Sequence, residues 1–203
     1  MTVISNGIDL RFFYGSKRSY PTSQPRILHV GRIAPEKNTE EVIRAFVLLK
    51  REIPDAPLTI VGDGPVLIDL KREASELNVA DSINFMGYRS RTDLPQIYHD
   101  HDLFVTASAM ETQGLVALEA IATGLPAVGV DAFALPELIH HGENGLVPAA
   151  HDVPAIAAAM VKILKDREFY ESASAMSIEI AAGHSHDRSV DRLEKIYRKA
   201  MVS

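Results

Sequence analysis

Short apolar runs alternate with helix-patterned segments over roughly the first 150 residues of this 203-residue chain, and no other feature limits the fold as strongly. The runs expected to form strands are residues 26–30, 58–61, 82–86, 103–106 and 127–130, with 145–147 as a sixth. They are apolar throughout, which is typical of strands buried on both faces of a sheet. Such alternation predicts an α/β fold with a parallel sheet of about six strands flanked by helices.

The helical patterns have recognisable ends. Asn38 is expected to cap the first helix, and Pro65 suits the first turn of the second. After Asp152 only helical patterns follow, which predicts an all-helical C-terminal segment. The expected helices are residues 39–52, 65–77, 92–99, 114–123, 153–165, 167–182 and 186–202. Residues 1–24 lack clear periodicity and are interpreted as a lead-in segment to a single Rossmann-like domain over residues 25–203.

Composition excludes several classes of function. The sequence has no Cys, which removes disulfide scaffolds, thiol nucleophiles and cysteine-based metal sites. A net charge of −6 does not fit a nucleic-acid binder. No apolar run approaches the roughly 20 residues of a membrane span, and the N-terminus shows no signal-peptide pattern. We therefore expect a cytoplasmic protein, with the membrane surface as an alternative location.

Ligands of parallel sheets bind beyond the carboxyl ends of the strands, so the loops after the expected strands are the candidate binding segments. In the loop after the first strand, Arg32 and Lys37 follow Gly31 and lie five residues apart. Arg can hold phosphate oxygens in a bidentate manner, and Lys acts as a point charge. The two residues could therefore face an anion, although taken alone such residues are more often surface charges.

The segment from Glu111 to Glu119 is the most informative. The helix expected to begin near Gly114 has free N–H groups at its start that form an anion site. Glu119 is the one charge in a helix reading GLVALEAIATG, and a carboxylate there is costly to bury unless a sugar or ribose hydroxyl pairs with it. The helical rise of about 1.5 Å per residue places Glu111 and Glu119 in one small cleft. The alternative is a solvent-facing Glu119 and a helix-capping Glu111.

Four motifs in order along the chain resemble those of the family 4 retaining glycosyltransferases, also called group 1 transferases, which have the GT-B fold. They are GRIAPEKN at residues 31–38, VGDGP at 61–65, FMGY at 85–88 and the Glu111…Glu119 pair. The resemblance covers residues 2 to about 200 and only the C-terminal, donor-binding half of that family. It implies that an N-terminal, acceptor-binding domain belongs elsewhere in the protein or on a partner chain.

The resemblance assigns roles to individual residues. Arg32 and Lys37 are similar to the pair that grips the donor diphosphate, Glu119 to the Glu that binds ribose hydroxyls, and Glu111 to the Glu that contacts the donor sugar. Arg32, Lys37 and Glu111 are the implied catalytic residues. The further implied donor-binding residues are Gly31, Gln113 and the backbone amides of Gly114 and Leu115 around the phosphates, with Met86, Gly87 and Tyr88 in the loop for the nucleobase.

The implied reaction moves a hexose from a nucleoside-diphosphate sugar, with a UDP-sugar favoured, to an acceptor such as a lipid or a glycan. We expect no cofactor and no metal, because the sequence lacks an Asp-x-Asp motif or another cluster with metal-ligand spacing. Fixed cations would then stabilise the departing diphosphate. The sequence departs from the family pattern at Phe133-Ala134-Leu135, before Pro136-Glu137, where the family often has a Gly-Gly pair.

Two other functions remain open at this point. One is a nucleotide-sugar-binding subunit or regulator without chemistry of its own, and the other is an unrelated nucleotide-binding α/β domain such as half of an epimerase.

The last expected helix carries a basic stripe. Three interpretations of this stripe remain open: a solvated face, a contact with the N-terminal domain, or a peripheral contact with anionic lipid.

Overall fold

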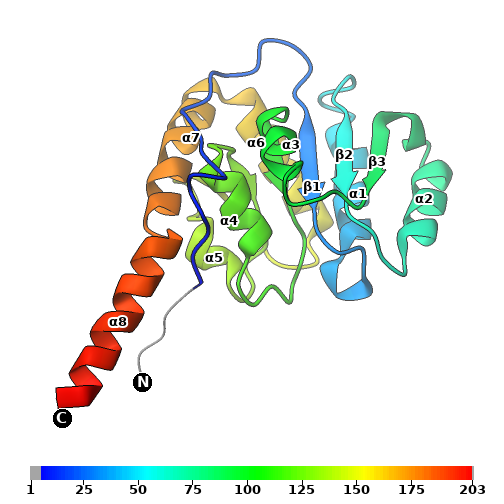
Figure 1. Cartoon of the computed structure of the whole chain (residues 1–203). Helices are drawn as coiled ribbons and strands as arrows, with labels where there is room; N and C mark the ends of the chain where they lie inside the picture. The colour runs from blue at the N-terminus through cyan, green and yellow to red at the C-terminus, as the bar shows by residue number, and fades with distance from the viewer. Residues whose placement is uncertain (1–5, 203) are drawn as a thin grey trace.

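A computed structural model describes residues 6–202 and shows one parallel sheet flanked by helices (Figure 1). The strands are β1 (Ile27–Val30), β2 (Leu58–Val61), β3 (Ile83–Gly87), β4 (Leu103–Val105), β5 (Ala127–Val128) and β6 (Gly145–Leu146). Their order is β3-β2-β1-β4-β5-β6, and every neighbouring pair is parallel. This confirms the predicted α/β class and the six-stranded sheet.

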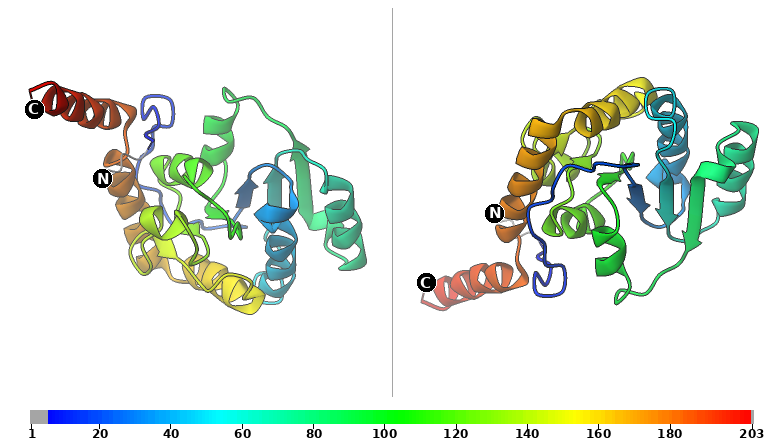
Figure 2. Two further views of the ribbon diagram at one scale, coloured as in Figure 1. Left: turned by 90° about the horizontal axis from the view of Figure 1, so that it is seen from below. Right: turned by 90° about the horizontal axis from the view of Figure 1, so that it is seen from above.

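The helices cover both faces of the sheet. Helices α1 and α6 lie side by side on one face, whereas α3 and α4 lie on the other, where α7 packs against α4 (Figure 2). The α-helices are α1 (Thr39–Leu49), α2 (Leu67–Glu76), α3 (Leu94–His99), α4 (Leu115–Ala122), α5 (Leu135–Leu138), α6 (Val153–Lys165), α7 (Arg167–Ala182) and α8 (His186–Val202), with 3-10 turns η1 (Pro35–Lys37) and η2 (Ala80–Ser82). The sequence predicted α6, α7 and α8 to the residue but not α5, η1 or η2.

The start of α1 differs from the prediction. Asn38 precedes the helix, but its side chain does not cap it. Its backbone is left-handed, with φ 49°, and its Nδ2 donates to the carbonyl oxygen of Ala107 at 3.1 Å. Asn38 therefore joins the loop after β1 to the loop after β4. The helix ends at Leu49, three residues before the predicted end, and α2 begins at Leu67, so Pro65 lies just outside it.

The described part of the lead-in segment lies against the domain. Ile8 and Phe13 are buried, and Ile8 pairs with Ser185 in an isolated parallel bridge. Arg18 donates from its guanidinium to four backbone carbonyls at the ends of α3 and α4. Gly15 lies so close to Thr123 that a Cβ on it would come within 2.6 Å of the Thr123 backbone. These contacts join residues 6–24 to the α3–α4 side of the sheet, and the predicted domain boundary at residue 25 stays a prediction.

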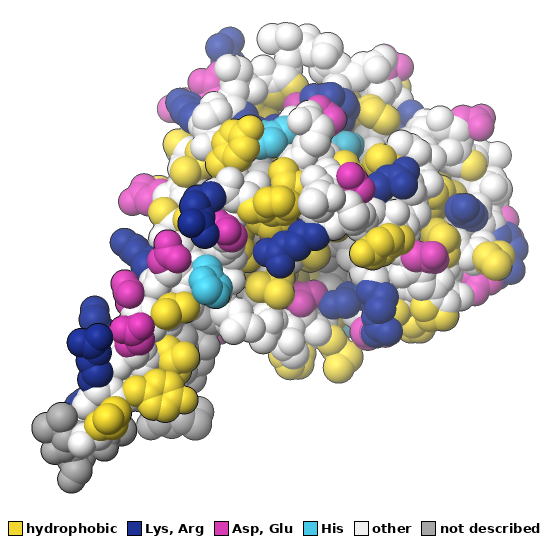
Figure 3. Space-filling model, in the orientation of Figure 1, with side chains coloured by type: hydrophobic (Ala, Val, Ile, Leu, Met, Phe, Trp, Pro, Cys, Tyr) yellow, Lys and Arg dark blue, Asp and Glu magenta, His cyan; other side chains and the backbone are white. Residues whose placement is uncertain are grey.

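Helix α8 extends away from the body of the molecule (Figure 1). Basic side chains follow one side of it, and the exposed apolar residues Val190, Leu193, Tyr197 and Met201 follow another (Figure 3). Within the described residues, no helix is both long and apolar enough to cross a bilayer. The predicted cytoplasmic location and the contact of this stripe with lipid or with another domain stay predictions.

Candidate active site

The central strands β1 and β4 are neighbours, although their connections leave toward opposite edges of the sheet. Such a switch point opens a crevice at the carboxyl ends of the two strands, where ligands of open α/β sheets bind. A cavity of about 250 Å³ lies there, which we call the switch-point pocket. Its lining includes Gly31, Arg32 and Lys37 from the loop after β1, and Glu111, Thr112 and Gln113 from the loop after β4, with Leu115 and Val116 of α4. The fold thus brings together the two predicted motifs.

Lys37 and Glu111 form an ion pair inside this pocket. Lys37 Nζ lies 2.6 Å from Glu111 Oε2, and the two side chains are only 22% and 16% exposed. The other carboxylate oxygen of Glu111 accepts a hydrogen bond of 3.3 Å from the backbone N–H of Gly114. Glu111 therefore occupies the position between a cation and the start of a helix that a bound anion would favour. An entering phosphate would compete with this carboxylate for both partners.

Gly114 shapes the start of α4. Its φ of 63° lies in the left-handed region, and a Cβ on it would come within 2.6 Å of Leu138 Cδ1. Glycine meets both requirements without strain. The next residue, Leu115, is partly exposed and lines the pocket. Gln113 is exposed and accepts a hydrogen bond of 3.0 Å from Asn6 Nδ2, which connects the lead-in segment to this turn.

Arg32 lies at the outer side of the switch-point pocket. Its side chain is 65% exposed and pairs with Glu36, one helical turn further along the same loop. A ligand could recruit this guanidinium at little cost, because an exposed ion pair stabilises a protein by at most about 1 kcal/mol.

The resemblance implies that this pocket binds a nucleoside diphosphate, and removing either cation should then weaken that binding. We expect Lys37→Ala and Arg32→Ala each to cost about 1.5–3 kcal/mol of binding free energy, the value of a charged hydrogen bond. Arg44→Ala is the matched control, because Arg44 lies on α1 and pairs with Glu73 away from the pocket. Isothermal titration calorimetry with UDP measures the affinity of each of the three variants. Unchanged affinity in both Lys37→Ala and Arg32→Ala would show that these residues are ordinary surface charges.

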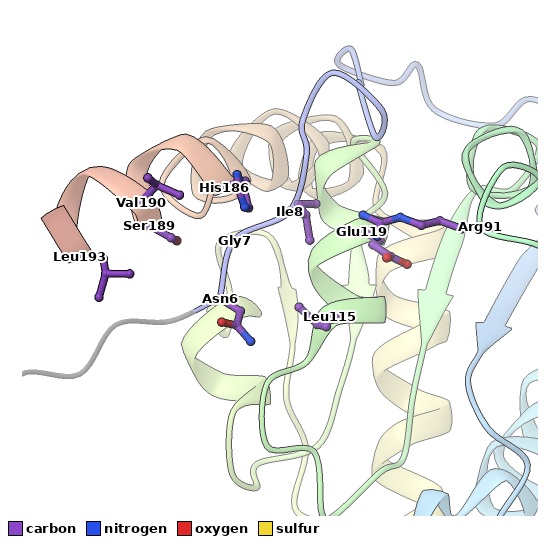
Figure 4. A pocket seen from close by; sticks show the side chains of 10 residues that line it. All are labelled: Asn6, Gly7, Ile8, Arg91, Leu115, Glu119, His186, Ser189, Val190 and Leu193. Atoms are coloured by element: carbon purple, nitrogen blue, oxygen red, sulfur yellow. The ribbon is translucent and has the colours of Figure 1, made fainter.

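Glu119 does not share the pocket of Glu111. It lines a second cavity of about 530 Å³, the Glu119 pocket, which meets the switch-point pocket at Leu115, a residue that lines both. The rest of its lining comes from the lead-in segment, the loop before α3 and the start of α8: Asn6, Gly7, Ile8, Arg91, His186, Ser189, Val190 and Leu193 (Figure 4). The expected single cleft is therefore a pair of adjoining hollows, with Glu111 in one lining, Glu119 in the other and Leu115 in both.

Glu119 is held by a buried tyrosine. The Tyr98 hydroxyl on α3 lies 3.1 Å from Glu119 Oε2 and 3.2 Å from the carbonyl oxygen of Val116. Burial raises the pKa of Glu119 above its usual value, while the Tyr98 hydrogen bond and the charge of Arg91 lower it. Partial burial of this carboxylate agrees with the prediction that its position is costly without a partner. Tyr98 supplies one such partner for Glu119, and the sequence analysis did not identify it.

Of the residues predicted for the nucleobase loop, Met86 and Gly87 form the end of β3, and Tyr88 follows the strand. The carbonyl oxygen of Gly87 accepts a hydrogen bond of 2.9 Å from Gly62 N, and Tyr88 is 74% exposed. Neither of the two pockets includes Met86, Gly87 or Tyr88 in its lining. Arg91 from the same loop does line the Glu119 pocket, and the sequence analysis did not select it.

His29 is a second residue that the sequence analysis missed. It is buried in β1 and forms part of the switch-point pocket. Its Nδ1 lies 3.0 Å from the carbonyl oxygen of Val105, and because a carbonyl only accepts, Nδ1 carries the proton. Nε2 then accepts from the Thr39 hydroxyl at 3.2 Å. Burial lowers the pKa of His29 to about 4, so the ring is neutral near pH 7. A histidine within the apolar run RILHV was the available signal.

The loop around Phe133, where the sequence departs from the family pattern, has a left-handed backbone conformation of the kind that glycine adopts easily. Phe133 has φ 49°, in the left-handed region that favours glycine, and its side chain is 66% exposed. The next amide, Ala134 N–H, donates to the carbonyl oxygen of Glu111 at 3.0 Å. This loop therefore supports the backbone at Glu111. Among the described residues, no group of three or more His, Asp or Glu side chains is placed to hold a metal ion.

Comparison with known proteins agrees with this arrangement. The sequence matches the family model described as "Glycosyl transferases group 1" over residues 15–179, which is most of the chain. The chain belongs to this family. Glycogen synthase of Mycobacterium tuberculosis is 36% identical to the group 1 chain over 166 residues, which cover 82% of this chain and 40% of that enzyme.

Solved structures extend the agreement to the fold. The pneumococcal O-GlcNAc transferase GtfA, in complex with UDP and GlcNAc, superposes with a TM-score of 0.80 at 25% identity, covering 97% of this chain and 39% of that one. The C-terminal domain of a Francisella tularensis group 1 glycosyl transferase gives 0.76 at 24% identity, covering 87% of this chain and 97% of that one. The group 1 chain spans about half the length, or less, of the first curated relatives it matches.

Proposed function

We propose that this group 1 chain is the donor-binding half of a retaining glycosyltransferase, which moves a hexose from a nucleoside-diphosphate sugar to an acceptor. The observation that carries the proposal is the switch-point pocket, where Arg32, Lys37 and the start of α4 converge on one anion-sized hollow. The GtfA complex with UDP, at 25% identity, supports UDP as the nucleotide. The superposition on an isolated C-terminal domain supports the assignment to the donor half.

The chemistry follows from charge. As the sugar–phosphate bond breaks, negative charge grows on the leaving diphosphate. In this proposal Lys37 and the positive end of α4 face the place where that charge develops, and the ligand recruits the exposed Arg32 from its pair with Glu36. Dipoles and cations arranged in this way stabilise a transition state. We propose that these groups perform the charge neutralisation that a metal supplies in other transferases.

Glu111 has the role of positioning the donor sugar in this proposal. Its two oxygens already bond to Lys37 and to the Gly114 amide, at the edge of the phosphate position. When a diphosphate takes over these two donors, the carboxylate is released toward the sugar and can accept hydrogen bonds from its hydroxyls. An acceptor hydroxyl then attacks the anomeric carbon from the face that the diphosphate leaves, and its proton passes to the departing diphosphate oxygen. This retains the anomeric configuration without a covalent step at Glu111. The acceptor site belongs to a further domain or a partner chain.

Titration of the pure chain with UDP and UDP-glucose tests the proposal. We expect both ligands to bind and their affinities to stay the same in EDTA and in excess Mg²⁺. We also expect little or no transfer of glucose to added acceptors by this chain alone. Failure to bind any nucleoside diphosphate would refute the proposal, and binding that needs Mg²⁺ would refute its metal-independent form.

Substitutions of Glu119 and Glu111 should affect the binding of UDP and UDP-glucose differently. Glu119→Gln is expected to weaken UDP and UDP-glucose equally, because the proposed contact is to the ribose that both ligands share. Glu111→Gln is expected to spare UDP, since it frees Lys37 from its ion pair, and to weaken only UDP-glucose. A lost charged hydrogen bond costs about 1.5–3 kcal/mol. The ratio of the two affinities in each variant is the measurement, and equal loss of UDP binding in both variants would show the roles to be wrong.

A further inference from the structure

Arg91 is an unassigned cation in the Glu119 pocket. It comes from the loop between β3 and α3, and Figure 4 shows its side chain reaching toward Glu119 on α4. The two charges influence each other, but no ion pair or hydrogen bond joins them among the described residues. A cation and a carboxylate thus line the same pocket, and the Arg91 side chain reaches toward Glu119 (Figure 4).

The lead-in segment holds Arg91 in place. Its guanidinium carbon lies 5.7 Å from the ring centroid of Phe12 and 5.9 Å from that of Phe13, at cation–π distance. Phe13 is fully buried and packs edge to face against Tyr98, the residue that bonds to Glu119. Phe13 therefore contacts both Arg91 and Tyr98, and through Tyr98 it supports the position of Glu119.

The chemistry of these two groups is complementary. A guanidinium donates hydrogen bonds and accepts none, whereas an ionised carboxylate accepts and donates none. Because Leu115 lines both hollows, a ligand with its phosphates near Lys37 and Arg32 would extend past Leu115 toward Glu119 and Arg91. The part of a nucleotide that follows the phosphates is the ribose, with two hydroxyl donors, and then the base.

We propose that Arg91 binds the base of the donor nucleotide and makes this pocket prefer bases with carbonyl oxygens over adenine, an inference that rests on the proposed function. Uracil and guanine present carbonyl acceptors to a guanidinium. Adenine presents an amino donor beside its ring nitrogen on the corresponding edge, which a donor-only group does not match. In this proposal Arg91 adds a side-chain contact to the base, and the expected role of Met86, Gly87 and Tyr88 stays a prediction.

Substitution of Arg91 and of an arginine outside both pockets tests this inference. Arg91→Met keeps an unbranched chain against Phe12 and Phe13 but removes the guanidinium donors. Arg44→Met is the control, because Arg44 pairs with Glu73 and lines neither pocket. We expect Arg91→Met to weaken UDP by about tenfold or more, while Arg44→Met changes it less than about twofold. Inorganic pyrophosphate, which lacks the nucleoside, should bind the parent chain and both variants alike.

Base preference is the second readout. In the parent chain we expect UDP or GDP to bind at least about tenfold more tightly than ADP, and this ratio should fall toward one in Arg91→Met. Unchanged UDP affinity in Arg91→Met, an unchanged base ratio or a parallel loss of pyrophosphate binding would each overturn the inference. If the parent chain bound no nucleoside diphosphate at all, the proposed function itself would fail, so the two failures are distinct.

Discussion

Arg18→Met is expected to lower the free energy of unfolding by about 3 kcal/mol. The Arg18 guanidinium donates to the carbonyl oxygens of Tyr98, His99, His101 and Thr123 at 2.8–3.1 Å. These carbonyls end α3 and α4, where helix dipoles place partial negative charge. Methionine fills a similar volume but removes the Arg18 donor from all four carbonyls. The Tyr98 carbonyl keeps backbone donors from Asp100 and His101, so the loss falls mainly on the other three. An unsatisfied group removed from water costs about 1–3 kcal/mol.

Arg11→Met is the matched control for this effect. Arg11 lies in the same lead-in segment, is 84% exposed and pairs only with the neighbouring Asp9. Its replacement should leave stability nearly unchanged, because exposed ion pairs contribute little. Urea denaturation of the parent chain and both variants measures the difference. If Arg18→Met unfolded at the same urea concentration as Arg11→Met, the four carbonyl contacts would have no net value.

Acidification should destabilise the protein through His29. Its pKa in the folded state is about 4, below the ordinary 6.5, because the ring is buried. Between these pH values the unfolded chain binds a proton that the folded chain does not. The full stability is therefore present above pH 6.5 and falls as the pH falls toward 4, by about 3 kcal/mol at 1.36 kcal/mol per pKa unit.

The variant that isolates this effect is His29→Asn, whose amide can still donate toward the Val105 carbonyl. Burial also lowers the pKa of His99 and His101, so the measurement is the difference between the parent and His29→Asn from pH 7 to pH 5. The parent should lose about 2 kcal/mol more than the variant over this range. Equal slopes in the parent and His29→Asn would contradict a neutral buried His29.

Many residues of the switch-point pocket could be predicted from the sequence to lie together, because they follow strands. Lys37 and Glu111 are 74 positions apart, yet both come after strands whose carboxyl ends meet at one edge of a parallel sheet. Arg91 and His29 were not predicted. Neither is distinctive as a residue type, and each becomes a site residue only through the side chains that surround it.

The sequence by itself determined the fold class and most element boundaries, because the period of apolar residues is a local property of the chain. It also carried the order of the motifs, and therefore the family. Tertiary structure alone decided that β1 lies beside β4, that Glu111 pairs with Lys37 and that Glu119 lines a different pocket from these two. These facts depend on strand order and on side-chain packing between distant segments, and no local pattern of residues encodes either of them.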